Sequence, residues 1–180
     1  MSMKQDIAAV WASEEQIRER VEALGKQIAR DYEGKQPLFV GVLKGCFIFM
    51  ADLVRACDLK STVDFMVVSS YGSGTVSSGA VEIIKDLSQD IYGRDVIIVE
   101  DILDSGNTLS YLKKLMLARS PASIRIVTLM DKPDRRKADV TADYVGFTIP
   151  DAFVVGYGLD YDQRYRNLPY IGILKPEVYS

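Results

Sequence analysis

Carboxylates, hydroxyls and a glycine are gathered in one short stretch, E-D-I-L-D-S-G-N-T, which runs from Glu100 to Thr108. Glu100 and Asp101 can bind the vicinal hydroxyls of a sugar or a Mg²⁺ ion, because both of these partners bind carboxylate oxygens. The loop after them opens a helical pattern, so its backbone N–H groups have no helical partners and attract a phosphate. The stretch therefore predicts a site for a phosphorylated sugar.

The loop itself is built for close contact with an anion. Gly106 lets the backbone turn and approach the phosphate, and Ser105 and Thr108 add hydroxyl donors. It is neither a Walker P-loop nor a G-x-G-x-x-G fingerprint. Taken singly, the acidic pair also fits a cap of the next turn, and Asp104 also fits an Asx turn. All of these residues together, in this order, favour a binding site over those alternatives.

The elements around this stretch place it in a crevice. Val96 to Val99 is a run of four β-branched residues, which is typical of a central parallel strand buried on both faces. We expect this strand to end at the acidic pair. In an open α/β sheet, ligands bind at the carboxyl ends of the strands, so the pair should line the binding crevice.

The rest of the chain alternates strand and helix patterns. Ser13 and Gln16 form a capping-box pattern before an amphipathic helix over residues 14–32. This alternation predicts an α/β fold with a doubly wound, mostly parallel sheet flanked by helices, in a single domain over residues 1–180. The other expected helices cover 46–57 and the residues after 108, and the other strands cover 38–43, 62–70, 81–85, 124–130, 144–149 and 153–157.

Composition limits the possible functions. The net charge is −3, which argues against broad affinity for nucleic acid. No apolar stretch approaches the ~20 residues of a membrane span, so we expect no membrane partner. The chain has no His, which excludes His-based acid–base chemistry and leaves carboxylates, Lys, Tyr or Cys. Cys46 and Cys57 lie among apolar residues and are expected to be inert thiols, which fits a cytoplasmic protein.

Residues 71–80, Y-G-S-G-T-V-S-S-G-A, are rich in Gly and Ser. A flexible loop beside a binding crevice often acts as a lid that excludes water during reaction. A simple hairpin tip remains the alternative.

The string V-I-I-V-E-D-I-L-D-S-G-N-T-L resembles the signature of type I phosphoribosyltransferases that binds phosphoribosyl pyrophosphate (PRPP). Further segments resemble the hypoxanthine-guanine type of this family, in the expected order. The resemblance implies the type I fold with a small hood built from about residues 1–36 and 150–180. The matching segments are Val42-Leu43-Lys44-Gly45, Ser70-Tyr71 at the start of the lid, Asp131-Lys132-Pro133, and residues 149–161 with Arg166.

The implied reaction belongs to purine salvage. It is Mg²⁺-dependent transfer of 5-phosphoribose from PRPP to N9 of hypoxanthine or guanine, giving IMP or GMP and pyrophosphate. Asp104 is the implied base near purine N7, and it also borders the PRPP site. The other implied PRPP contacts are Lys44, Gly45, Glu100, Asp101, Ser105, Gly106, Asn107, Thr108 and Arg166, with Glu100, Asp101 and Asp160 as Mg²⁺ ligands. The loop at Lys44 often holds a non-proline cis peptide in this family.

The resemblance also implies how the purine is selected. Lys132 can donate to a 6-oxo group but cannot accept from the 6-amino group of adenine. Phe153 would stack on the base, and Val154 would present backbone groups to its edge, with Asp160 nearby. Without the motif, Lys132 would be an ordinary surface lysine and Phe153 a core residue.

Two positions depart from the pattern, and two other functions stay open. Asn107 and Ala152 stand where some relatives carry basic residues, so one phosphate contact and one contact beside the base are in doubt. A nucleotide-sensing regulator that binds RNA or DNA would need a basic face, which the acidic composition does not favour. An enzyme for adenine is disfavoured by Lys132, whereas xanthine stays open. The implied partners are PRPP, the purine, and further copies of the chain in a homodimer or homotetramer.

Overall fold

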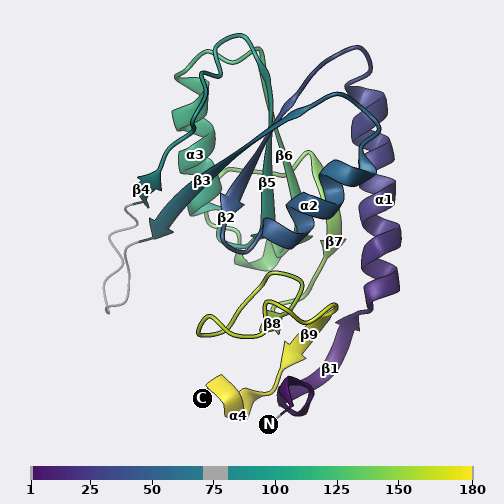
Figure 1. Ribbon diagram of the computed structural model, residues 1–180. Helices are drawn as coiled ribbons and strands as arrows, with labels where there is room; N and C mark the ends of the chain where they lie inside the picture. Colours follow the sequence, from purple (N-terminus) through teal and green to yellow (C-terminus); the bar gives the residue numbers. More distant parts are fainter. Residues whose placement is uncertain (1, 71–80, 180) are drawn as a thin grey trace.

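The computed structural model describes residues 2–70 and 81–179, and a six-stranded sheet organises them (Figure 1). The strand order is β4-β3-β2-β5-β6-β7, and every neighbouring pair is parallel except β3 and β4. The predicted mostly parallel sheet is therefore confirmed. The strands are β2 (Leu38–Leu43), β3 (Thr62–Ser70), β4 (Val81–Lys85), β5 (Asp95–Leu103), β6 (Ser123–Asp131) and β7 (Tyr144–Thr148).

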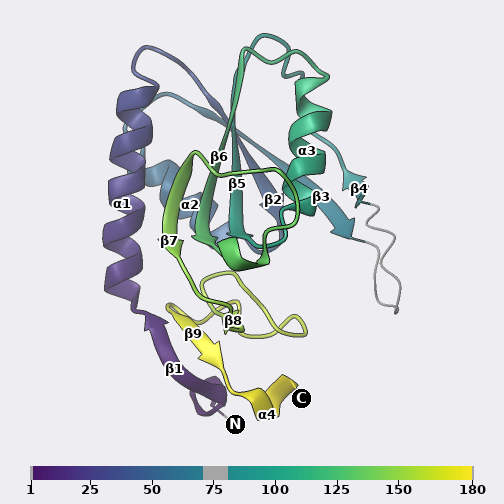
Figure 2. The same cartoon turned by 180° about the vertical axis from the view of Figure 1, so that it is seen from behind.

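Helices cover both faces of this sheet, as Figures 1 and 2 show from opposite sides. Helices α1 (Glu14–Asp31) and α2 (Phe47–Ala56) lie on one face, and α3 (Asn107–Leu117) lies on the other. Side chains alternate along a strand, so Ile97 of β5 packs in the core under α1 and α2, whereas Ile98 packs in the core under α3. This arrangement is the predicted doubly wound fold.

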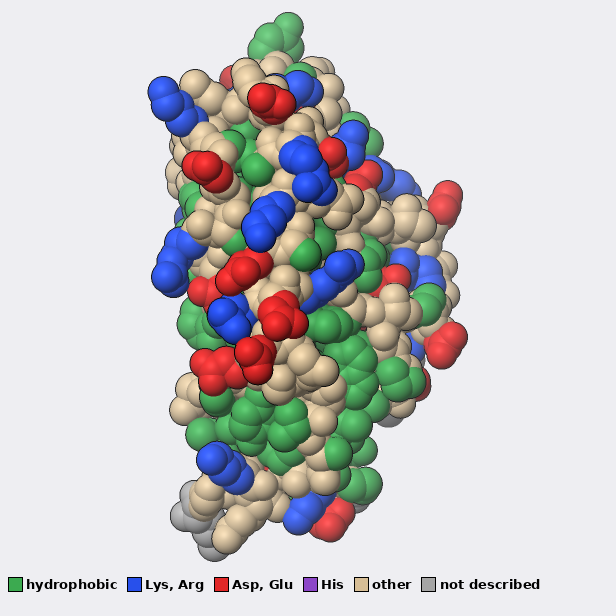
Figure 3. All heavy atoms as spheres, turned by 90° about the vertical axis from the view of Figure 1, so that its right-hand side faces the viewer, with side chains coloured by type: hydrophobic (Ala, Val, Ile, Leu, Met, Phe, Trp, Pro, Cys, Tyr) green, Lys and Arg blue, Asp and Glu red, His purple; other side chains and the backbone are tan. Residues whose placement is uncertain are grey.

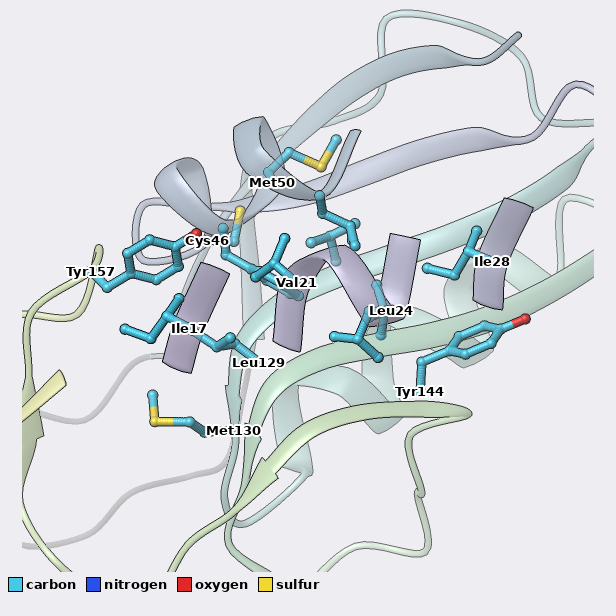
Figure 4. Packing of buried hydrophobic residues seen from close by; sticks show 14 of the residues in the cluster. Ile17, Val21, Leu24, Ile28, Cys46, Met50, Leu129, Met130, Tyr144 and Tyr157 are labelled. Carbon is cyan, nitrogen blue, oxygen red and sulfur yellow. The ribbon is translucent and has the colours of Figure 1, made fainter. Parts of the chain in front are cut away.

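Helix α1 is held by its apolar stripe. Ser13 and Gln16 form the predicted capping box at its start. Its buried residues point from one face of the helix toward α2 and β6 (Figure 4). They are Ile17, Val21, Leu24 and Ile28. Seen from the α1 side, the surface of the molecule carries mixed charges above a hydrophobic area (Figure 3). None of the described helices is long and apolar enough to cross a membrane.

A second, three-stranded sheet lies below the carboxyl ends of the main strands (Figure 1). It is antiparallel, with the order β1-β9-β8, and is the observed hood. Helix α1 does not join this second sheet but buries its apolar face against the main sheet. The remaining elements are β1 (Ile7–Ala12), β8 (Val154–Val155), β9 (Ile171–Leu174), η1 (Met3–Asp6), η2 (Pro133–Arg135) and α4 (Pro176–Tyr179).

Strand β5 extends further than the sequence indicated. We expected it to end at Glu100 and Asp101, but it continues to Leu103. The reason is that β6 pairs with it along this whole length, up to Leu103 opposite Asp131. The acidic pair therefore lies inside a rigid strand and not in a loop. Both residues nevertheless line the same pocket at the end of the strand.

Candidate active site

A pocket of about 240 Å³ lies at the carboxyl ends of β2 and β5. It is formed by the loop between β2 and α2, by one residue of β3, and by the stretch from Glu100 to Leu109. Most of the predicted PRPP contacts meet there, although they come from different strands. Those that line it are Lys44, Gly45, Glu100, Asp101, Asp104, Gly106 and Thr108.

Asp101 packs directly against the β2–α2 loop. Its Oδ1 accepts a hydrogen bond of 2.7 Å from the backbone N–H of Ile102, and a Cβ placed on Gly45 would lie 1.6 Å from its Oδ2. Any side chain at residue 45 would therefore have to displace the carboxylate of Asp101. The peptide bond between Leu43 and Lys44 is cis, as the resemblance implied. Burial raises the pKa of Asp101.

Glu100 carries an unpartnered buried oxygen. Its Oε2 is shielded from solvent and has no hydrogen-bond partner within the described part of the chain. Burial, and then the negative charges of Asp101 and Asp104, raise the pKa of Glu100 well above its usual value. A buried carboxylate of this kind is costly unless a donor or a cation reaches it. The pocket therefore favours a ligand that supplies hydroxyls or a metal ion.

The other end of the pocket is the start of α3. Gly106 is its N-cap with φ = +79°, a left-handed conformation that favours glycine. A Cβ there would also lie 2.6 Å from Cγ1 of Val140. No side chain caps this helix, so the backbone N–H groups of its first turn, which begins at Asn107 and Thr108, are available to an anion. Ser105 lies just outside the helix, in the loop.

Arg136 holds the phosphate loop in place, and sequence reasoning missed it. Its Nε donates to the carbonyl of Asp104 at 2.9 Å, and its Nη1 donates to the carbonyl of Val140 at 2.7 Å. Its Nη2 donates to the carbonyl of Leu103 at 3.2 Å and forms an ion pair with Asp131. In the run K-P-D-R-R-K it looks like an ordinary solvated charge, so the sequence carries no signal for this role.

Asp104 lines the pocket, whereas Ser105, next to it in the loop, does not. The Asp104 residue is exposed, and its negative charge acts on both Glu100 and Lys132. It therefore lies between the acidic pair and the predicted purine-selecting lysine. The carbonyl of Ser105 accepts from the N–H groups of Lys137 at 2.9 Å and Ala138 at 3.0 Å, which fixes the loop from the side of the β6–β7 connection.

The predicted purine residues lie at the junction of β6 and the hood. Lys132 is only 8% exposed, its Nζ donates to the carbonyl of Ala152 at 2.5 Å, and it lies 3.9 Å from a carboxylate oxygen of Asp151. Burial lowers the pKa of Lys132, while Asp151 acts in the opposite direction. Phe153 is 38% exposed, whereas Val154 is buried. Lys132 is thus a positioned donor rather than the solvated lysine of the alternative interpretation.

Two cations meet beside the β2–α2 loop. Arg166 pairs with Oδ1 of Asp160 at 2.8 Å and donates to the carbonyl of Gly158 at 2.7 Å. Gln163 accepts from Nζ of Lys44 at 3.3 Å and from Nη2 of Arg166 at 3.2 Å, so one amide oxygen joins both cations. Gln163 was not selected from the sequence, because its setting there is that of an ordinary turn residue.

Some predicted residues lie outside this pocket or outside the described part of the chain. The five predicted site residues that follow α3 in the chain do not line the 240 Å³ pocket. They are Lys132, Phe153, Val154, Asp160 and Arg166. Ser70 ends β3, and Tyr71 and the lid over 71–80 lie outside the described residues. Within residues 2–70 and 81–179, no group of three or more acidic, Cys or His side chains forms a metal cage. A larger hollow of about 520 Å³ lies between α1 and α2, and no predicted site residue lines it.

Comparison with known proteins identifies the family. Residues 13–162 match the phosphoribosyl transferase domain. The hypoxanthine-guanine phosphoribosyltransferase of Bacillus subtilis is 60% identical, with 99% of each chain covered. The bifunctional protein TilS/HprT of Listeria monocytogenes is 58% identical over 99% of this chain, which spans only 28% of that protein. A crystal structure of a Staphylococcus aureus hypoxanthine phosphoribosyltransferase is 54% identical with a TM-score of 0.96, covering 99% of this chain and 97% of that one. The chain therefore belongs to the phosphoribosyltransferase family, among the hypoxanthine-guanine phosphoribosyltransferases.

Proposed function

We propose that the protein transfers 5-phosphoribose from PRPP to N9 of hypoxanthine or guanine, giving IMP or GMP and pyrophosphate in purine salvage. The main support is the 240 Å³ pocket, which is lined both by Glu100, with its buried and unpartnered Oε2, and by the uncapped start of α3. An acid pair at one end and free N–H groups at the other fit the hydroxyls and the 5-phosphate of one ribose 5-phosphate.

The leaving pyrophosphate is assigned to the two cations on the hood side. Negative charge builds up on it as the bond to ribose C1 breaks, and preorganised cations stabilise that charge. Arg166 is already oriented by Asp160 and Gly158, and Lys44 is joined to it through Gln163. In the proposed complex, both side chains exchange the amide oxygen of Gln163 for phosphate oxygens.

Mg²⁺ is the proposed cofactor, and the residues present fit it. Carboxylate oxygens are its preferred protein ligands, and it commonly takes only one or two of them together with waters and substrate phosphates. Glu100 and Asp101 would hold one ion and Asp160 another, and the free Oε2 of Glu100 offers such a ligand. When bound, the metal neutralises charge on PRPP and its leaving group.

Asp104 and Lys132 are assigned to the purine. Asp104 lines the pocket, where it can take or hold the proton of purine N7 while N9 attacks C1. Lys132 donates to the 6-oxo group, and its short bond to the carbonyl of Ala152 fixes the direction of its ammonium. Phe153 supplies an exposed ring for stacking, and the backbone of Val154 meets the far edge of the base.

We further infer a cytoplasmic enzyme that assembles as a homodimer or homotetramer. Cys46 and Cys57 are free and buried, which fits a reducing compartment. Light scattering coupled to gel filtration would measure the assembly, and a monomeric mass would contradict this part of the proposal.

The experiment for the reaction mixes the protein with PRPP, Mg²⁺ and each of hypoxanthine, guanine, xanthine and adenine, and follows nucleotide and pyrophosphate. We expect product with the 6-oxopurines. Asp104→Asn should lower kcat by roughly 10²- to 10⁴-fold, as for loss of a general base, and Lys132→Ala should weaken discrimination against adenine. Asp58→Asn removes an exposed carboxylate outside the site and serves as the control. No product with any base would refute the proposal.

A further inference from the structure

Three aromatic rings from separate segments of the chain meet at Phe153. Tyr179 of α4 stacks on Phe153, with 4.7 Å between the ring centroids and 19° between the planes. Tyr161 meets the same ring edge-on at 5.6 Å and 85°. Tyr161 and Tyr179 also contact each other, at 6.4 Å and 66°. The function proposed above uses neither tyrosine.

The position of α4 indicates which side of the Phe153 ring remains for a ligand. In Figures 1 and 2, α4 lies at the end of the hood that is remote from the six-stranded sheet. The other side of the purine site is Lys132, which leaves the end of β6 and reaches the carbonyl of Ala152, next to Phe153. Tyr179 therefore covers the ring from the hood side, and 38% of the Phe153 residue remains exposed.

We propose that Tyr179 is a positioning residue for the purine, acting through Phe153; this rests on the proposed role of Phe153 in stacking on the base. A half-exposed phenyl ring can rotate about its side-chain bonds, and ordering it when a base binds costs affinity. A stacked neighbour and an edge-on neighbour hold the plane of the ring before the base arrives. Tyr179 then strengthens purine binding without touching ribose or phosphate.

The kinetic test separates the two substrates. Tyr179→Ala should raise KM for guanine roughly three- to tenfold, the range expected from losing one aromatic pair, and should leave KM for PRPP unchanged. Tyr179→Phe keeps the ring and should restore the wild-type value. Tyr92→Ala is the matched control, since Tyr92 is 74% exposed. Thermal unfolding of each variant checks that it is folded.

A double variant tests whether Tyr179 acts through Phe153. If it does, Phe153→Ala with Tyr179→Ala should bind guanine no more weakly than Phe153→Ala alone, because coupled residues are not additive. Additive losses would overturn the proposed route. An unchanged KM for guanine in Tyr179→Ala, or equal increases in KM for guanine and PRPP, would overturn the role itself.

Equilibrium binding distinguishes this inference from the proposed reaction. Calorimetry with GMP should show weaker binding by Tyr179→Ala than by the wild type, with PRPP binding unaltered. Equal GMP affinity would overturn the inference even if the enzyme is active. If the wild type forms no nucleotide at all, the proposed reaction fails, while the GMP comparison still decides the role of Tyr179.

Discussion

Gly45→Ala is the sharpest test of the acid-pair geometry. The added Cβ would lie 1.6 Å from Oδ2 of Asp101, so the carboxylate has to retreat by about 2 Å to reach ordinary contact. That movement breaks its alignment with the ribose hydroxyls or Mg²⁺, an interaction worth about 1.5–3 kcal/mol for a charged group. At 1.36 kcal/mol per factor of ten, we expect kcat/KM for PRPP to fall about 10- to 150-fold.

The assay measures initial rates at saturating hypoxanthine while PRPP is varied. The backbone at Gly45 is not left-handed, so alanine introduces no conformational penalty there beyond this contact. Gly93→Ala is the control: Gly93 has φ = +66° with open space around it, so its variant should lose about 1 kcal/mol or more of stability but keep kcat/KM. A folded Gly45→Ala protein whose kcat/KM for PRPP is within twofold of wild type would refute the reasoning.

Two further predictions concern buried titratable groups. Burial opposes ionisation of Asp64, but the N–H groups of Phe65 and Ser88 and the charge of Lys85 outweigh it and lower the pKa of Asp64. Ionised Asp64 therefore stabilises the fold above the pKa that it has in the unfolded chain. This stabilisation is lost as pH falls through its lower pKa in the folded protein. Asp64→Asn should lower the free energy of unfolding by about 1–3 kcal/mol at neutral pH, with the deficit shrinking as pH falls below about 4; a deficit in urea unfolding that is independent of pH would contradict this. Burial raises the pKa of Cys57 to about 11, so a disulfide reagent at about pH 8 should label this thiol only after unfolding; rapid labelling of the native protein would be the opposite result.

The sequence predicted the family and the sheet because their signals are local. The β-branched run of β5 is buried on both faces. The loop from Asp104 to Gly106 lies between β5 and α3, although α3 begins at Asn107, two residues earlier than expected. Turn chemistry and helix capping depend on neighbouring residues, so they can be read without the fold. The roles of Asp104, Lys132 and the other site residues stay predictions.

The missed features depend on contacts between distant residues. Strand β1 pairs irregularly with β9, with Ile7 opposite Leu174, and neither shows a clear alternating pattern. Arg136, Gln163 and Tyr179 acquire their contacts only when separate segments meet, and each has an ordinary surface setting in the sequence. The extension of β5 beyond Val99 likewise depends on β6, because Glu100 and Asp101 are poor strand formers by propensity alone.

The hydrogen bonds of Arg136 join two segments that are assigned to different substrates. The loop after β5 is assigned to the sugar phosphate, whereas the β6–β7 connection carries Lys132, which is assigned to the purine. Because one guanidinium bonds to the backbone carbonyls of Leu103, Asp104 and Val140, it holds these two segments in a fixed position relative to each other. Lysine cannot reproduce this planar set of donors. On these assignments, purine preference cannot be changed by replacing the β6–β7 connection alone. A segment transplanted from a relative to change the choice of base must bring its own arginine, or the binding of ribose 5-phosphate will weaken.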